Sequence, residues 1–162
     1  MAFLRANRSP ANLDITQIDE VLAKTGMRDM NVAALHYIKY VHHLAREEIE
    51  AAEASLGNLV DMADVYPAGL EDGVWLDVAM FDVLFRQNLE SAKSNRKKVV
   101  PNGFTDKSQL SLVDAAIAIF ESDYEAGKSH IETARSHLPN VMLTGVGQIY
   151  VKLLTQLEGK CP

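Results

Sequence analysis

The sequence predicts an all-α protein of about seven to eight helices, arranged as stacked antiparallel helical hairpins. Apolar residues recur every three or four positions through most of the chain, which places them on one face of a helix. Three of these segments begin with the same pattern, a bulky residue, a glutamate and two small residues, at Ile49, Leu89 and Tyr124. Each segment is followed by a proline, and the offsets between them are 40 and 35 residues. Repetition at this period is typical of stacked helical arrays.

The length and composition predict one folded domain. A chain of 162 residues can bury one sizeable core, and its 48% hydrophobic and 23% charged residues are ordinary for a globular protein. Residues 1–12 lack helical periodicity, so we expect a flexible N-terminal arm there and a single helical-repeat domain over 13–162. The single cysteine, Cys161, excludes an internal disulfide.

The charge and hydropathy exclude two classes of partner. A net charge of −6 disfavours nucleic acid, because binding to the phosphate backbone requires concentrated positive charge. The apolar stretch from Val74 to Phe85 is interrupted by Asp77 and Asp82, and no run of about 18 uncharged apolar residues occurs, so we expect no membrane insertion. Because the N-terminus also lacks the apolar region of a secretory signal, the predicted location is cytoplasmic.

The N-terminal third predicts a short helix and one hairpin. The short helix, Leu13–Lys24, carries apolar residues at helical spacing on one face. A longer apolar series then continues without a proline from Asn31 to Tyr66, about 36 residues, whereas helices average about 11–12. Arg46–Glu48 is a run of polar residues, and similar polar residues occur at the predicted turns of the later hairpins. We therefore expect a break in the helix there. Asn31–Ala45 would be the first helix of this hairpin.

The remainder predicts two further hairpins and a closing helix. Val74–Phe85 is apolar on nearly every side, so it should lie at the centre of the fold, with Leu89–Val100 as its partner. In the third hairpin, Gln109–Glu121 pairs with the helix that begins at Tyr124 and stops before Pro139. Leu143–Leu157 is amphipathic and is expected to cover the last hairpin.

The third hairpin resembles a tetratricopeptide (TPR) repeat. Tyr124, Gly127, Ile131, Ala134 and Pro139 match the bulky, small, bulky, small and proline positions of the second TPR helix. The resemblance extends over residues 31–139 in a divergent form, since Arg96 stands at an apolar position of the second repeat and the first helices lack the family's full motif. It implies a right-handed stack of hairpins, a TPR-like α-solenoid.

The same resemblance implies where a partner binds. In the TPR family a concave groove is lined by the first helices of successive repeats, here 31–45, 74–85 and 109–121, and it binds a protein or peptide. The polar residues on these helices are the predicted partner-binding residues: Lys39, His42, Asp77, Asp82 and Asp114. We therefore expect a protein–protein interaction module or scaffold, whose partner is another protein or peptide or a second copy in a homo-oligomer.

Two alternatives stay open: a helical-bundle enzyme or small-ligand or metal-binding domain with a pocket beside Val74–Phe85, and a regulatory domain of a larger protein. No catalytic residue, cofactor or metal is predicted. His43 and Glu47 have the i, i+4 spacing of a metal-binding pair, but no matching set stands on another helix. Gly145 and Gly147 do not form a phosphate-binding loop, because no strand precedes them.

The small residues of the third hairpin allow a further expectation. If another helix passes closely over Gly127 and Ala134, Ala134→Leu should destabilise the protein by overpacking. Gly127→Ala should be neutral or stabilising if the fit allows one methyl group, because alanine is the better helix former.

Overall fold

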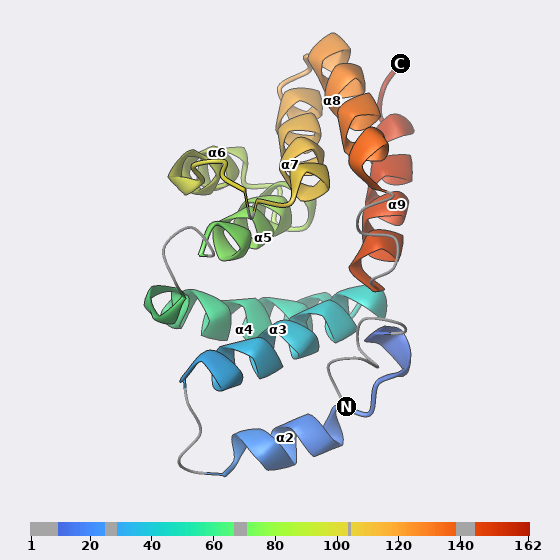
Figure 1. Ribbon diagram of the computed structural model, residues 1–162. Helices are drawn as coiled ribbons and strands as arrows, with labels where there is room; N and C mark the ends of the chain where they lie inside the picture. The colour runs from blue at the N-terminus through green and yellow to red at the C-terminus, as the bar shows by residue number, and fades with distance from the viewer. Residues whose placement is uncertain (1–9, 25–28, 67–70, 104, 139–144) are drawn as a thin grey trace.

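The computed structural model describes residues 10–24, 29–66, 71–103, 105–138 and 145–162 (Figure 1), and their regular structure is entirely helical. This confirms the predicted all-α class with seven to eight helices. The described helices are α2 (Thr16–Leu22), α3 (Asp29–Ala45), α4 (Ile49–Asp61), α5 (Asp72–Leu84), α6 (Leu89–Lys98), α7 (Lys107–Phe120), α8 (Tyr124–His137) and α9 (Gly145–Glu158), with 3-10 turns η1 (Pro10–Asn12) and η2 (Ala63–Val65). Among these helices, none is both long enough and apolar enough to cross a bilayer.

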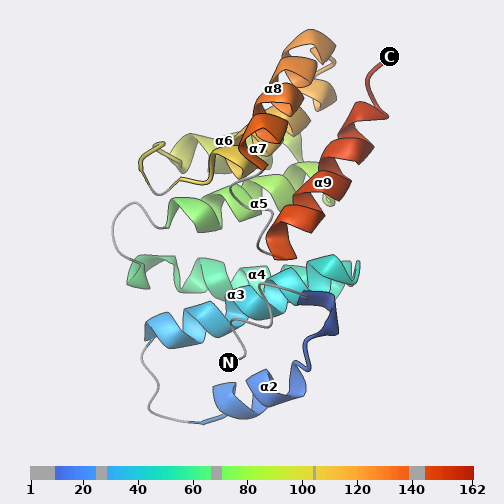
Figure 2. The same ribbon diagram turned by 45° about the vertical axis from the view of Figure 1, so that its right-hand side comes forward.

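Six of the helices form three successive hairpins, α3–α4, α5–α6 and α7–α8 (Figures 1 and 2). Neighbouring hairpins meet through α4 against α5, α6 against α7, and α5 against α7. This confirms the predicted sequential pairing, including the contact of α6 with both α5 and the following hairpin. The short helix α2 packs on the outer side of α3.

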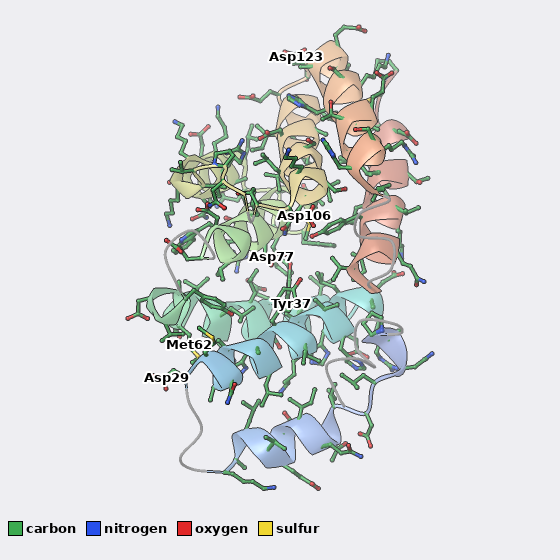
Figure 3. The ribbon with its side chains drawn as sticks, in the orientation of Figure 1. Asp29, Tyr37, Met62, Asp77, Asp106 and Asp123 are labelled. Carbon is green, nitrogen blue, oxygen red and sulfur yellow. The ribbon has the colours of Figure 1, made fainter. Side chains whose placement is uncertain are left out.

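All three hairpin turns contain one residue in the left-handed conformation: Glu47 (φ 61°), Gln87 (φ 53°) and Ser122 (φ 67°). In the third turn the Asp123 N–H donates to the Ala118 carbonyl at 2.9 Å and the Ser122 N–H to the Ile119 carbonyl at 3.0 Å, the two bonds of a Schellman motif. The side chain of Asp123 then accepts from the Ala126 N–H and caps α8 (Figure 3). The predicted break at Arg46–Glu48 is confirmed, because Glu47 reverses the chain there.

The core is built around α5, as its sequence predicted. Its buried residues point to all sides of the helix, because α4, α6 and α7 surround it. One part of the predicted N-terminal arm, however, is helical. Pro10–Asn12 was predicted to belong to the flexible arm, but Pro10 is buried against α3 and its carbonyl accepts a hydrogen bond from His42. Residues 1–9 of that arm lie outside the described residues.

The closing helix α9 covers more than the last hairpin. It contacts α7 and α8, as predicted, and its N-terminal part also reaches α3 (Figure 2). Four large side chains on one face of α9 are buried: Tyr150, Leu153, Leu154 and Leu157. Helix α9 therefore contacts two of the three helices that were expected to line a TPR-like groove, α3 and α7.

The apolar face of α8 packs tightly on α7. Gly127, Ile131 and Ala134 are buried, which agrees with the helical face predicted from their spacing. A Cβ atom added at Gly127 would lie 2.5 Å from Cγ1 of Ile119. Cγ1 is close to the helix backbone and cannot swing away freely. The contact therefore lacks the space for one methyl group, which the expectation of a neutral or stabilising Gly127→Ala required.

We now predict that both substitutions on this face destabilise the protein. Overpacking typically costs about 1–3 kcal/mol, which exceeds the roughly 1 kcal/mol that alanine gains over glycine in a helix. Gly127→Ala should therefore lower the free energy of unfolding by about 1 kcal/mol, and Ala134→Leu by about 2–3 kcal/mol. Urea denaturation measures both.

Gly57→Ala is the matched control. Gly57 lies within α4, and a Cβ atom there would have no neighbour within 4 Å. This variant should gain up to about 1 kcal/mol. If Gly127→Ala were as stabilising as Gly57→Ala, the contact between α7 and α8 would be looser than the structure shows.

Candidate functional site

The five predicted partner-binding residues do not form one surface. Lys39 donates to Asp19 of α2 at 2.6 Å, and Asp114 binds Arg96 of α6 through two hydrogen bonds of 2.7 and 3.1 Å. Lys39 and Asp114 are partly exposed, so a contact with a partner remains a prediction for these two.

The other three, His42, Asp77 and Asp82, are 4%, 6% and 1% exposed. They face the interior because α3 and α5 are contacted on several sides by other helices, which the individual helix sequences do not show. The prediction that these three line an open groove is therefore wrong for this structure.

Asp82 is the centre of a hydrogen-bond network between α5 and α6. Its Oδ1 accepts from Arg86 Nη1 at 2.5 Å, and its Oδ2 accepts from Ser91 Oγ at 2.6 Å and from Asn95 Nδ2 at 3.0 Å. Arg86 also binds Glu53 on α4. The carboxylate thus links three helices, which is a structural role.

Asp77 lies where α5 faces α3 and α7. Its Oδ1 accepts from Gln109 Nε2 at 2.7 Å. Burial raises the pKa of Asp77 to about 8, although the hydrogen bond from Gln109 and the nearby Tyr40 hydroxyl act in the opposite direction. The Tyr40 hydroxyl faces this carboxyl without a hydrogen bond of good geometry. Asp77 is therefore an acid that holds its proton at neutral pH.

Tyrosines surround this buried acid. Burial raises the pKa values of Tyr37, Tyr40 and Tyr150, and the nearby Asp77 carboxyl contributes to each shift. Figure 3 shows Tyr37 on α3 and Asp77 on α5 in the space between these helices, with Asp106 at the start of α7. The cluster brings polar groups of α3, α5 and α9 near one another, but Asp77 lines neither hollow described below.

A cleft of about 500 Å³ lies between α9 and the α3–α4 turn, and we call it the α9 cleft. Its volume is in the range of ligand and peptide-anchor sites. Its apolar wall comes from the end of α3, the start of α4, the end of α5 and one face of α9. The lining residues are Pro10, Ala11, Asn12, Leu44, Ala45, Glu47, Ile49, Phe85, Gln148, Ile149, Lys152, Leu153 and Gln156.

The rim of the α9 cleft is polar. Lys152 of α9 forms an ion pair with Glu47, the left-handed residue of the α3–α4 turn. Gln148 and Gln156 are exposed on α9 beside this pair. An apolar wall with amide and charged groups at its edge can hold a large apolar side chain and bind the polar backbone next to it. Sequence reasoning missed the cleft because its walls come from four separated stretches of the chain.

A second, shallower hollow lies beside the start of α5, where the bundle alternative expected a pocket. Its lining includes Asp61, Asp64, Glu71 and Trp75. Lys98 lies over the Trp75 ring, 3.6 Å from the centroid. The hollow is acidic and open, and an acidic surface of this kind is ordinary for a solvated helix end.

Two buried histidines meet a glutamate at the α3–α4 turn. His42 Nδ1 lies 2.6 Å from the Pro10 carbonyl oxygen, and His43 Nδ1 lies 2.7 Å from Glu48 Oε2. One ligand atom from each of His42, His43 and Glu48 lies within 4.8 Å of the others. The metal-binding spacing considered from the sequence, His43 with Glu47, is not the pair that forms.

No protein-family model, curated protein or solved structure matches this chain.

Proposed function

We propose that this protein is a cytoplasmic helical-repeat interaction module that binds a short segment of another protein in the α9 cleft. The observation that carries the proposal is the cleft itself, with its apolar wall, polar rim and volume of about 500 Å³. The stacked hairpins and the TPR-like pattern of the third hairpin support a binding role rather than a catalytic one.

The position of α9 indicates why the site differs from the groove expected for a TPR-like array. Because α9 packs on α3 and α7, a partner cannot lie along the inner helices without displacing it. The α9 cleft lies beside this helix and remains accessible. It would accept one or two large apolar side chains against Phe85 and Ile149, with the partner's backbone near Gln148 and Gln156.

A second candidate function is the binding of a small apolar molecule. The same volume favours it, because sites of 300–1,000 Å³ also hold small ligands, as a rough guide. Native mass spectrometry of the purified protein separates the candidates: a bound small molecule that is lost on Ile149→Glu would favour ligand binding over peptide binding.

We predict that Ile149→Glu weakens peptide binding at least about tenfold. Ile149 lines the cleft and is half-buried, so a carboxylate there would be desolvated by a bound apolar side chain. Peptides selected from a displayed library on the parent protein would be measured by fluorescence anisotropy. Circular dichroism would establish that the variant is folded.

Val100→Glu is the matched control, because Val100 is 72% exposed and lies outside the cleft. It should bind the selected peptides as the parent does. A selection that enriches no peptide, or equal binding by Ile149→Glu and the parent, would reject the proposed site. Sedimentation velocity tests whether the partner is a second copy: a dimer that Ile149→Glu dissociates would assign the cleft to self-association.

A further inference from the structure

We propose that His42, His43 and Glu48 bind a late first-row divalent metal ion, with Zn²⁺ as the best fit. This inference is independent of the proposed function, and it departs from the expectation of no metal drawn from the sequence. The three residues come from the last turn of α3 and the residue preceding α4. The turn places them together, with one ligand atom of each within 4.8 Å of the others.

His42 is oriented for coordination. Its Nδ1 donates to the Pro10 carbonyl at 2.6 Å, which fixes the proton on Nδ1 and leaves the Nε2 lone pair available. Among the described residues, the hydrogen bond of the His42 ring is the one from Nδ1 to Pro10. A ligand histidine that donates its other ring N–H to a carbonyl or carboxylate is the usual arrangement in metal sites, because it holds the ring in place.

His43 and Glu48 supply the other two ligand atoms. His43 Nδ1 and Glu48 Oε2 are 2.7 Å apart. A small increase in this distance would let both atoms bind one ion. Zinc bonds to nitrogen and to carboxylate oxygen are each about 2.0–2.2 Å long. Arg46 Nε holds the other carboxylate oxygen, Oε1, at 2.7 Å and would orient Glu48 as a ligand.

The donor set indicates the kind of metal. Two nitrogen ligands and one oxygen ligand favour zinc and its neighbours over Mg²⁺ and Ca²⁺, which prefer oxygen alone.

Three protein ligands would leave one position of a tetrahedral zinc ion for water or another ligand. The ion would also connect the α3–α4 turn to η1 through His42 and Pro10. Pro10 and Glu47 both line the α9 cleft, so the metal would stabilise one wall of that cleft.

The alternative is that the same residues form an internal ion pair without a metal. Zinc titration by calorimetry separates the two, using tag-free full-length protein treated with a chelator and then dialysed. We expect saturation at one equivalent of Zn²⁺, and a rise in the thermal midpoint of about 5–10 °C at a free Zn²⁺ concentration of 100 times the dissociation constant. Mg²⁺ should give neither effect.

The variants His42→Ala and Glu48→Gln should each weaken zinc binding at least about tenfold. His130→Ala on α8 is the matched control, since His130 lies outside the cluster, and it should bind zinc as the parent does. Unchanged affinity in His42→Ala and Glu48→Gln, or no saturable binding by the parent, would overturn the proposal.

If either variant fails to fold, Co²⁺ added to the parent decides the matter. One equivalent should give the intense visible ligand-field bands of a four-coordinate ion. The weak spectrum of hydrated Co²⁺ would overturn the site.

Discussion

Replacing Asp77 by asparagine is expected to raise the free energy of unfolding at pH 8 by about 3–5 kcal/mol, with little change near pH 4. In the folded protein, burial raises the pKa of Asp77 to about 8 from its ordinary value of 3.8. The folded state therefore keeps the proton that the unfolded state releases between these two pH values. Stability from this group is fully present below about pH 4 and is lost as the pH rises through 8.

Asparagine keeps the shape of the protonated acid and removes its titration. Its side-chain oxygen can still accept from Gln109, and its amide group, like a protonated carboxyl, is a hydrogen-bond donor. Urea denaturation of the parent and of Asp77→Asn at pH 5, 6, 7 and 8 would give the difference in stability at each pH. That difference should grow with pH. Asp61→Asn, an exposed position on α4 with the same change of formal charge, controls for the net charge.

A difference that stays constant between pH 5 and pH 8 would contradict the prediction. It would mean that Asp77 is ionised in the folded protein, with water or a counter-charge beside it. The tyrosines around Asp77 make that result unexpected, since Tyr40 and Tyr150 are 1% and 3% exposed and bring no positive charge.

The helices could be predicted closely because their boundaries depend on local chemistry. The starts of α4, α6 and α8 at Ile49, Leu89 and Tyr124 match the repeated pattern. The interior position of α5 also followed from its sequence, which is apolar on all sides. The burial of Asp77 and Asp82 could not be predicted from the sequence. An aspartate on an apolar helix suggests a solvated face until the contacts from α3, α6 and α7 are known.

The histidine–glutamate pairing shows where helical spacing fails. An i, i+4 rule pairs His43 with Glu47, provided that the helix continues through both. Glu47 instead takes a left-handed conformation, which ends α3 and turns its side chain towards Lys152 of α9. Glu48 then faces His43. One reversed φ angle thus determines both the rim of the α9 cleft and the candidate metal ligands. The sequence predicted a break at Arg46–Glu48, but it did not indicate which residue takes the left-handed conformation.

Replacing Asp82 by alanine is expected to lower the free energy of unfolding by about 2–4 kcal/mol. Removing one partner of a buried ion pair typically costs about 3–5 kcal/mol, because the remaining charge loses its compensation. The loss should be somewhat smaller here, since Arg86 is partly exposed and keeps Glu53 as a partner. Ser91 and Asn95, however, lose an acceptor in a partly buried position.

Asp114→Ala is the matched control for this prediction. Asp114 also accepts hydrogen bonds from an arginine, Arg96, but both side chains of that pair are about a quarter exposed. A pair in contact with water contributes about 0–1 kcal/mol, so its loss should be small. Urea denaturation at neutral pH measures both variants. If Asp82→Ala were no more destabilising than Asp114→Ala, burial of the Asp82 network would contribute nothing to its strength, and the link between α5 and α6 would depend on apolar packing alone.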